Sequence, residues 1–500
     1  MNIARNLERS AFYFPDRPAS SEDLSETSYA QLNDRANRVA TALIQMGIRP
    51  GDHIGLCAPN SVDWLAFYFG VIKAGAVAVT LSSLLKRDEL SRLLNHSKPK
   101  ILFTYDEKLD ELADLERGEY LERIICPQGD LDFGRLLEMG SGSFRAVDRD
   151  RNDTAVIMYT GGTTGIPKGV MLTHENINTA IQTVVFNERS NEKDRALCFL
   201  PFNHVFGQMH IMNATILSAG SLEVMPGFDM DRVLSAMEAG RLTKFFAVPT
   251  IYIRLLALEG LDEKLGSVRY CLSAATTMAA DVVRQWKERT GLAIYEGYGM
   301  TEAAPTVTYN HYYRHVIGSV GTEVPGVEVQ IRDEHGNRLE EGHRGEVCVR
   351  GRNIMKGYLG DPEGTREAFW EEGWFRSGDI GLFDDDGYLY IVDRLKDMVI
   401  TGGENVYPRE VEEVLYTRPE IQECAVIGLP DKEWGERVTA FVMLKPGESL
   451  DQEELKAYMK SRLSSFKVPK EYLIVNDFPR SPAGKVLKRE LKKRFLEQSQ

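Results

Sequence analysis

The sequence predicts an α/β protein with a large N-terminal domain and a small α+β C-terminal domain. The chain has 500 residues, more than one hydrophobic core usually serves, so two or more domains are expected. Up to about residue 320, short β-rich runs alternate with helical stretches; beyond it, glycine turns separate short strands. The large domain should therefore combine parallel-type α/β subdomains with a β-rich subdomain.

The first third of the chain has the pattern of βαβ units. Short apolar runs at 52–59, 76–81 and 100–105 are typical of strands. The stretches between them, 61–75 and 87–97, are expected to be helices. Strands and helices that alternate in this order favour a largely parallel sheet.

The same alternation returns in the middle of the chain. The expected elements are strands at 195–201, 221–226, 244–250 and 269–275, and helices at 232–240 and 280–291. Further on, 326–339 and 345–351 are typical of short strands bounded by glycine turns. This change of pattern marks the β-rich subdomain.

The end of the chain has the pattern of a separate small domain. Residues 388–408 contain a strand, a charged DRLKD segment and a glycine pair. The elements expected after it are a helix at 408–418, strands at 424–430, 439–445 and 472–475, and a helix at 451–463. We therefore expect an N-terminal domain at 1–392, a hinge at 393–397 and a C-terminal domain at 398–500.

The composition is that of an ordinary globular protein, with 43% hydrophobic and 27% charged residues. Lys and Arg number 60 against 74 Asp and Glu, so the formal net charge is −14. An excess of negative charge opposes unspecific attraction to nucleic acid or to an anionic membrane. A polyanionic ligand would therefore have to be held by a local site.

The cysteines and the apolar runs favour a reducing cytoplasm. The six cysteines are far apart and form no CxxC pair, so the sequence signals neither a zinc site nor a disulfide framework. The N-terminal stretch lacks the continuous apolar core of a secretory signal. The longest apolar run, 64–72, is much shorter than the roughly 20 residues that span a bilayer. Peripheral membrane contact stays open.

Residues 159–170 read YTGGTTGIPKGV, directly after the apolar run TAVIM. Glycines allow close approach to a ligand, and threonine hydroxyls and backbone N–H groups can surround phosphate oxygens. Lys168 would add a point charge. The segment is not a Walker loop, because Gly169 follows the lysine and a strand-like run follows Gly169. We expect a loop that joins two strands, with Thr173 capping the next helix.

This segment resembles the phosphate-binding signature of the acyl-adenylate-forming superfamily, which includes acyl-CoA synthetases, firefly-type luciferases and the adenylation domains of peptide synthetases. Further matching segments follow in the family's order: LPFNHVFG at 200–207, YEGYGMTE at 295–302, GWFRSGDIG at 373–381, DRLKDMVITGGENVYP at 393–408 and PRSPAGKVLKREL at 479–491. The resemblance spans nearly the whole chain. It implies that the small domain is mobile and that ATP, Mg²⁺ and CoA are used.

The family's reaction joins a carboxylate to the α-phosphorus of ATP, releases pyrophosphate and passes the acyl group to a thiol. The resemblance implies that residues of the glycine-rich loop and the later motifs bind ATP or AMP. These residues are Thr160, Gly161, Gly162, Thr163, Thr164, Gly165, Lys168, Ala274, Ala275, Glu296, Gly297, Tyr298, Gly299, Met300, Asp379 and Arg394. Within this set Tyr298 would stack on adenine, and Asp379 would accept the ribose hydroxyls with Arg394 beside it.

The resemblance also implies the catalytic groups. Thr301 would bond the α-phosphate, and Glu302 would bind Mg²⁺, a cation that prefers oxygen ligands. His204 would lie beside the acyl carboxylate, although a lone histidine among apolar residues is more often part of the core. Lys485 would bridge the carboxylate and the α-phosphate. The neighbouring KRELKKR segment is expected to form a solvated helical face.

For the thiol step, the resemblance assigns the hinge to Lys396. It assigns the path of the CoA pantetheine to Gly402, Gly403 and Glu404. Two departures from the family's usual pattern concern other positions. Gly161 stands where serine is common, a form also found in fatty acyl-CoA synthetases. The segment 274–277 reads AATT instead of GGAP, and the added methyl groups could narrow the acyl channel.

The acyl pocket is expected to be apolar. Its predicted wall is Phe206, Phe245, Phe246, Ala247 and Val248, with no charged residue nearby that suggests a second substrate carboxylate. The favoured substrate is a medium- to long-chain fatty acid. Alternatives are an aryl or cinnamate-type CoA ligase, an acyl-AMP ligase that loads a carrier protein, and a non-catalytic acyl-AMP-binding protein. The sequence leaves monomer and homodimer open.

Overall fold

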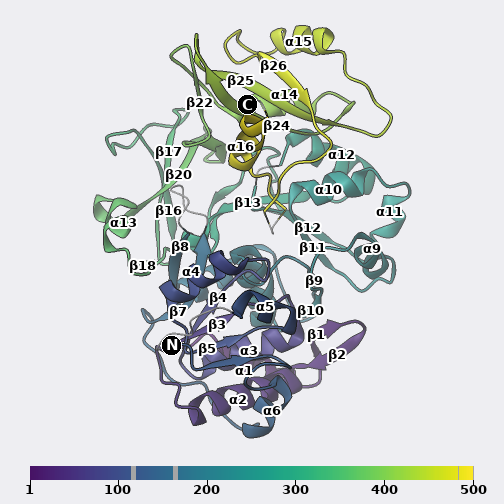
Figure 1. Cartoon of the computed structure of the whole chain (residues 1–500). Helices are drawn as coiled ribbons and strands as arrows, with labels where there is room; N and C mark the ends of the chain where they lie inside the picture. The colour runs from purple at the N-terminus through teal and green to yellow at the C-terminus, as the bar shows by residue number, and fades with distance from the viewer. Residues whose placement is uncertain (114–119, 161–166, 277, 482–483, 499–500) are drawn as a thin grey trace.

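The computed structural model describes residues 1–113, 120–160, 167–276, 278–481 and 484–498. Figure 1 shows a large lower part that contains the N-terminus and a smaller upper part that contains the C-terminus. The predicted α/β class, with a large N-terminal and a smaller C-terminal domain, is confirmed. None of the helices in the described ranges combines the length and apolarity that a bilayer crossing requires.

The first sheet contains the predicted βαβ units. Among the described residues it has seven strands in the order β18-β8-β7-β4-β3-β5-β6. Their bounds are β3 His53–Leu56, β4 Val77–Thr80, β5 Ile101–Phe103, β6 Arg123–Ile125, β7 Thr154–Thr160, β8 Lys168–Thr173 and β18 Gly357–Tyr358. Strands β3 to β7 pair in parallel, and β8 and β18 add antiparallel edges. Strands β7 and β8 form the hairpin that contains the predicted phosphate-binding loop. We call it the phosphate-loop hairpin, and it lies where the parallel part of the sheet ends.

The second sheet carries the middle of the chain. Its described strands follow the order β15-β14-β13-β12-β11-β9-β10-β1-β2. Their bounds are β1 Pro18–Glu22, β2 Ser25–Ser28, β9 Arg195–Cys198, β10 Ser221–Val224, β11 Lys244–Ala247, β12 Tyr270–Ser273, β13 Ile294–Gly299, β14 Thr306–Tyr309 and β15 Thr322–Glu323. Strands β9 to β13 are parallel, so their carboxyl ends share one edge. Ligands of open α/β sheets bind at such edges.

Helices cover these two sheets. Their bounds are α1 Arg5–Tyr13, α2 Tyr29–Gln45, α3 Val62–Lys73, α4 Arg87–Ser97, α5 Leu109–Leu112, α6 Phe133–Met139, α7 His174–Asn187, α8 Ala214–Leu217, α9 Met230–Glu238, α10 Pro249–Leu256, α11 Leu261–Lys264 and α12 Ala280–Thr290. Helix α3 is buried along almost its whole length, as its continuous apolar run requires. A buried π-helix, η2 Phe206–Asn213, runs directly into α8. Its wide turns position side chains of the site described below.

The β-rich subdomain is an antiparallel sheet beside the parallel ones. Its described strands are β16 Val327–Arg332, β17 Gly345–Gly351, β19 Phe369–Trp370, β20 Trp374–Phe383 and β21 Leu389–Arg394. The short helix α13 Pro362–Glu367 precedes β19. Strand β21 leads out of this sheet towards the C-terminal domain. The expected hinge at 393–397 starts at the end of this strand.

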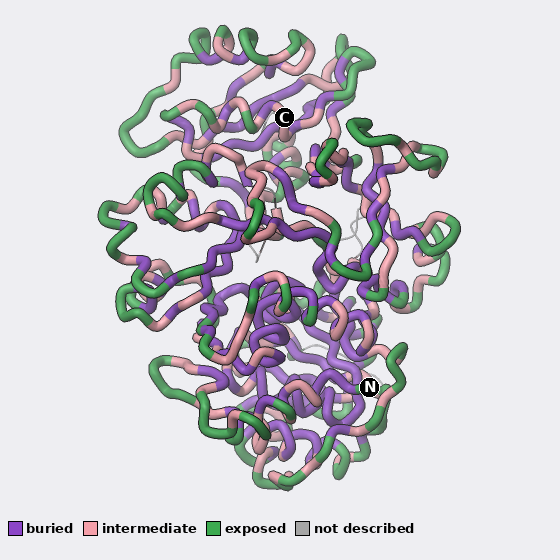
Figure 2. The backbone as a smooth tube through the Cα atoms, turned by 180° about the vertical axis from the view of Figure 1, so that it is seen from behind, coloured by how far each residue is buried: buried purple, intermediate pink, exposed green. Residues whose placement is uncertain are grey.

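The C-terminal residues form their own sheet and core. The elements are β22 Val399–Thr401, β23 Glu404–Val406, α14 Pro408–Tyr416, β24 Ile421–Asp431, β25 Gly435–Leu444, α15 Gln452–Lys460, β26 Glu471–Ile474 and α16 Lys488–Gln498. Two hydrophobic clusters lie entirely within these residues. Figure 2 shows the buried backbone concentrated in the larger part, with a thinner buried layer in this sheet.

Helix α16 corrects one prediction. The KRELKKR segment is not a fully solvated face, because Lys488 and Lys492 are half-buried and make ion pairs inside the small domain. The Lys488 ammonium lies 2.8 Å from Glu412, and that of Lys492 lies 3.0 Å from Glu436. These ion pairs therefore join the helix to α14 and to β25.

The N-terminus of α7 connects two distant parts of the chain. The Thr173 hydroxyl accepts a hydrogen bond from the Asn176 backbone N–H at 3.1 Å, which confirms the predicted cap. The buried Asn176 amide also donates to the carbonyls of Arg352 and Ile354, at 2.7 and 2.8 Å. These bonds fix the loop between β17 and β18.

We predict that Asn176→Ala lowers the free energy of unfolding by about 2 to 4 kcal/mol, because it removes two buried donors and leaves carbonyl oxygens unpaired. Asn178→Ala is the matched control on the same helix, since Asn178 is half-buried and makes one long 3.4 Å bond to Asn6. Urea unfolding followed by circular dichroism measures both. Equal losses in the two variants would contradict the role given to Asn176.

Candidate active site

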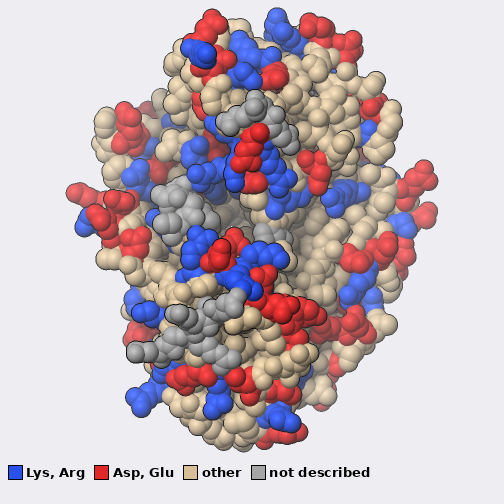
Figure 3. Space-filling view, in the orientation of Figure 1, with Lys and Arg blue, Asp and Glu red and all other residues tan. Residues whose placement is uncertain are grey.

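A cavity of about 1160 Å³ lies where the two α/β sheets, the β-rich sheet and the C-terminal domain meet. Figure 3 shows Lys and Arg gathered above a central hollow, although the whole chain is acidic. Most of the predicted site residues line this cavity: Thr160, Lys168, His204, Phe206, Ala274, Ala275, Gly297, Tyr298, Gly299, Met300, Thr301, Glu302, Asp379, Arg394, Lys396 and Lys485. Gly161, Gly162, Thr163, Thr164 and Gly165 lie outside the described residues.

The phosphate-loop hairpin has the predicted form. Strands β7 and β8 are antiparallel neighbours, with Thr160 opposite Lys168 at the point where the loop begins and ends. The loop thus joins two strands, and α7 begins only after β8. The Lys168 ammonium lies 4.4 Å from the centre of the Tyr358 ring. At that distance the ring attracts the cation.

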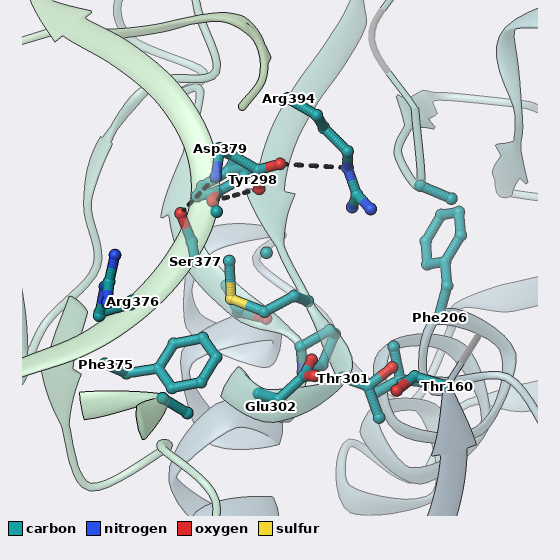
Figure 4. A pocket seen from close by; sticks show the side chains of 18 of the residues that line it. Thr160, Phe206, Tyr298, Thr301, Glu302, Phe375, Arg376, Ser377, Asp379 and Arg394 are labelled. Carbon is teal, nitrogen blue, oxygen red and sulfur yellow. Dashed lines mark hydrogen bonds and ion pairs between the residues drawn. The ribbon is translucent and has the colours of Figure 1, made fainter. Parts of the chain in front are cut away.

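Sheet pairing brings together the two residues that were predicted to contact the ribose. Asp379 on β20 lies opposite Arg394 on β21, and cross-strand neighbours of opposite charge attract each other. The Arg394 Nε lies 3.1 Å from one Asp379 oxygen, and the Tyr298 hydroxyl donates to the other at 2.7 Å. Figure 4 shows both interactions beside the cavity. The carboxylate is therefore fixed from two sides.

Two glycines of the YEGYGMTE segment occupy tight places. A Cβ on Gly299 would lie 1.4 Å from the Pro305 carbonyl oxygen, so no other residue fits without moving the backbone. A Cβ on Gly297 would approach the Thr308 oxygen at 3.3 Å. This close packing of β13 against β14 directs the short helix η3, Thr301–Ala303, to the cavity.

Glu302 lies on η3, which contacts β8 of the hairpin. Its carboxylate accepts a hydrogen bond from the Tyr358 hydroxyl at 3.1 Å. Burial raises the pKa of Glu302, while this bond and the Arg394 charge oppose the rise. No cluster of three or more metal-binding side chains is found in the described part of the chain. One carboxylate together with ATP phosphate oxygens is a donor set that fits Mg²⁺.

His204 and Lys485 both line the cavity. The His204 Nδ1 accepts a hydrogen bond from the Phe206 backbone N–H at 3.2 Å, so the proton of the neutral ring lies on Nε2. Burial and then the Lys485 charge lower the pKa of His204 to about 4. Burial, followed by the charge of Arg394, lowers the pKa of Lys485 to about 8. A neutral N–H donor thus lies near an ammonium group.

The predicted acyl wall is corrected in part. Phe206 lines the cavity, but Phe245, Phe246, Ala247 and Val248 do not. Phe245 and Phe246 lie on opposite sides of β11, because successive strand residues face opposite sides. Phe245 packs against Phe199 and Tyr252. Phe246 forms a second layer behind Phe206, with ring centres 6.4 Å apart.

The sequence reasoning missed His210 and Tyr309, which line the cavity beside Phe206. The His210 ring lies 5.0 Å from Phe206 and 5.9 Å from Tyr309, centre to centre. His210 is the fourth residue after Phe206 in the π-helix, and this spacing in HVFGQMH was the available signal. Tyr358 lies in MKGYLGD, where nothing in the sequence marked it.

A buried charged residue lies directly before the predicted wall. The Lys244 ammonium lies 2.8 Å from Glu188 and 3.4 Å from Asp194, so it is already paired within the protein. Glu188 also accepts hydrogen bonds from His210 and Tyr309, both at 2.7 Å. The charges of Lys244 and His210 lower the pKa of Glu188 to about 2 against the opposing effect of burial.

The remaining predicted residues lie around the domain junction. Glu296 lines a second cavity of about 480 Å³ that also touches Lys396 and Lys485. Burial raises the pKa of Glu296 to about 7. Gly402 and Gly403 form the turn between β22 and β23, with φ of 59° and 84°, and Glu404 follows them. This turn lines neither of the two cavities.

Comparison with known proteins supports the resemblance found in the sequence. The family model described as AMP-binding enzyme matches residues 7–359, and the model of the AMP-binding enzyme C-terminal domain matches 410–485. A feruloyl-CoA synthase of an Amycolatopsis species is 37% identical over 478 residues, which cover 94% of each chain. A long-chain-fatty-acid–CoA ligase of Bacillus subtilis (strain 168) is 34% identical over 522 residues, covering 97% of this chain and 93% of the relative.

A solved structure also has a closely similar fold. The anthranilate CoA ligase AuaEII in complex with anthranoyl-AMP superimposes with a TM-score of 0.94 at 29% identity. The match covers 99% of this chain and 97% of that one. Together these relatives include ligases named for both aromatic and alkyl acids.

We predict that the rate of pyrophosphate release falls at alkaline pH because Lys485 loses its proton. The ammonium with a lowered pKa loses its proton as the pH rises through about 8, so kcat/KM, which reports the free enzyme, should fall above that pH. Bound anions raise the lysine pKa, so kcat should hold to higher pH. The measurement is pyrophosphate release from pH 6 to 10.

Lys485→Arg is the control, because a guanidinium stays charged across this range. Its kcat/KM should lose the alkaline fall. Lys485→Ala should slow pyrophosphate release by on the order of 100-fold, as expected for one lost electrostatic contact, while thioester formation from supplied acyl-AMP survives. An unchanged alkaline limb in the arginine variant would show that another group titrates.

Proposed function

Because the chain belongs to the AMP-binding enzyme family and is an ATP-dependent acyl-CoA ligase, we propose that its acid substrate is an aromatic or similarly flat, compact monocarboxylic acid. The enzyme is an AMP-forming acid–thiol ligase that uses ATP, Mg²⁺ and CoA. This proposal chooses the aryl or cinnamate-type alternative over the medium- to long-chain fatty acid that the sequence favoured.

The observation that carries the proposal is the group of rings at the inner side of the cavity. Phe206, His210 and Tyr309 line the cavity together with His204, and the His210 ring contacts the other two rings. Aromatic pairs in offset or edge-to-face contact add about 0.5 to 1.5 kcal/mol each beyond the burial of their area. A flat acyl group gains these contacts, whereas a flexible alkyl chain does not.

The charged groups behind these rings also support a compact acid. Glu188 and Lys244 are almost fully buried, with side chains 2% and 3% exposed. An alkyl chain that extended past His210 and Tyr309 would meet this ion pair, because Glu188 bonds to both residues. Breaking a buried pair costs about 3 to 5 kcal/mol. A ring that ends at His210 and Tyr309 leaves the pair intact.

We assign roles in the first step as follows. The acid oxygen attacks the α-phosphorus of ATP, and pyrophosphate leaves, so two anions must approach each other. The His204 Nε2–H would donate to the acid carboxylate, and the Lys485 ammonium would neutralise charge between the two reactants. Mg²⁺ held by Glu302 would supply further neutralisation at the phosphates.

In the second step the CoA sulfur bonds to the acyl carbon and AMP leaves. We propose that the C-terminal domain turns about Lys396, inside the expected hinge at 393–397, so that Gly402 and Gly403 replace Lys485 at the cavity. Support comes from their positions: Lys485 lines the cavity, whereas the glycine turn lies away from it on the same small domain. Both glycines have positive φ, so most side chains would strain this turn.

We predict that kcat/KM for CoA thioester formation is highest with benzoate- or cinnamate-type acids. It should be at least about tenfold lower with hexanoate, octanoate and palmitate, which corresponds to the loss of about 1.4 kcal/mol of ring contacts. Thioester formation is followed across this panel at fixed ATP, Mg²⁺ and CoA. A rising activity from hexanoate to palmitate would instead support the long-chain fatty acid.

Phe206→Leu and Phe245→Leu form a matched pair for the same panel. Phe206 lines the cavity and Phe245 lies on the far side of β11. The first change should lower the ratio of aryl to alkyl activity several-fold, by the loss of one aromatic contact of about 1 kcal/mol. The second should leave that ratio unchanged. The proposal fails if both variants keep the wild-type ratio.

A further inference from the structure

Tyr358 lies between two groups that the reaction uses. It is a residue of β18, at the edge of the first sheet, and is 8% exposed. It pairs with Val170 on β8, two residues after Lys168. Residues two apart on a strand face the same side, and diagonal neighbours across an antiparallel pair lie within reach of long side chains. Strand pairing therefore places the Lys168 ammonium over the Tyr358 ring, at 4.4 Å from its centre.

The same tyrosine contacts the acidic group on the other side. Its hydroxyl donates to the Glu302 carboxylate at 3.1 Å. The backbone of the segment that leads into β18 is tied to the same residue, because the Met355 N–H donates to the Glu302 carbonyl at 2.8 Å. Both the main chain and the side chain thus connect β18 with η3.

Local contacts hold Tyr358 in place. Its backbone N–H donates to the Thr365 hydroxyl at 2.9 Å, and this hydroxyl donates to the Asp361 carbonyl at 2.7 Å. The preceding Gly357 has φ of 146°, and a Cβ there would lie 2.8 Å from a Thr365 methyl group. The turn into α13 therefore leaves the tyrosine little freedom.

The electrostatics fit a fixed donor. Burial and the nearby negative charge of Glu302 raise the pKa of Tyr358 far above its ordinary value, so the hydroxyl keeps its proton. The hydrogen bond from this hydroxyl fixes the direction of the Glu302 carboxylate. An oriented carboxylate is a ligand suited to a hard cation.

We infer that Tyr358 is a positioning residue that holds Lys168 and Glu302 in a fixed relation, so that the phosphate-binding cation and the Mg²⁺ ligand meet the same ATP molecule correctly. The ring supports the ammonium, and the hydroxyl orients the carboxylate. This inference rests on the use of MgATP and not on the identity of the acid.

Tyr358→Phe separates the two functions, because it keeps the ring and removes the hydroxyl. We expect its affinity for MgATP, measured by calorimetry without any acid, to fall about tenfold, the usual scale for a lost hydrogen bond to a charged group. Affinity for ATP in the presence of EDTA should stay close to that of the wild type. The Mg²⁺ concentration for half-maximal pyrophosphate release should rise by a similar factor.

Tyr390→Phe is the matched control. Tyr390 is a half-buried tyrosine on β21 that lies near Asp384 and lines neither of the cavities described above. Its loss of a hydroxyl should leave both MgATP affinity and Mg²⁺ demand unchanged. Thermal unfolding of each variant shows that the folded state persists.

A double variant tests whether the hydroxyl acts through Glu302. Glu302→Gln alone should raise the Mg²⁺ demand, and adding Tyr358→Phe to it should change MgATP affinity less than twofold. The inference is overturned if Tyr358→Phe leaves MgATP affinity unchanged, or if its tenfold effect persists in the Glu302→Gln background. Because no acid is present in the binding measurement, failure of the substrate proposal would not affect these outcomes.

Discussion

The pairing of β8 with β7 on one side and β18 on the other is the contact on which the site depends. It ends the parallel sheet with a hairpin, and so opens a loop at the carboxyl edge of β7. It also adds β18, which lies nearly two hundred positions further along the chain, to the same sheet. Through Tyr358, that strand gives the loop lysine and the acidic residue of η3 a shared contact.

A second pairing lies within the β-rich sheet, next to the small domain. Asp379 and Arg394 are opposite each other on β20 and β21, and β21 is the last strand before the C-terminal domain. The same arginine contributes to the lowered pKa of Lys485, which reaches the cavity from the small domain. The charge state of that lysine therefore depends on where the small domain lies, because burial is the largest cause of the shift.

Much of this could be predicted from the sequence, for reasons that differ between parts. The βαβ units follow from alternating apolar runs, and the Thr173 cap follows from local chemistry. The long helix α2 was not predicted, since its polar residues hide a buried face. The strands β1 and β2 were not predicted either, because PASSE and SETS are mostly polar. The motif resemblance identified most of the residues that line the cavity. It could not show that Phe245 and Phe246 lie outside the lining, because the alternation of side chains along a strand decides which of them face the cavity. His210 could have been found from its spacing after Phe206 in the π-helix, whereas Tyr358 depends on contacts across the fold, which no local pattern records.

The buried network beneath the ring-lined pocket constrains how this ligase could acquire a new substrate. Glu188 contacts Lys244, His210 and Tyr309, and Lys244 in turn contacts Asp194. Replacing one charged member leaves its partner uncompensated in the core, at a cost of about 3 to 5 kcal/mol, comparable to much of a domain's stability. Single substitutions that survive selection should therefore fall on uncharged lining positions such as Leu272 and Thr308. A change of acid preference would therefore come from substitutions of the uncharged residues that line the pocket. The buried charged residues beneath the pocket would stay the same.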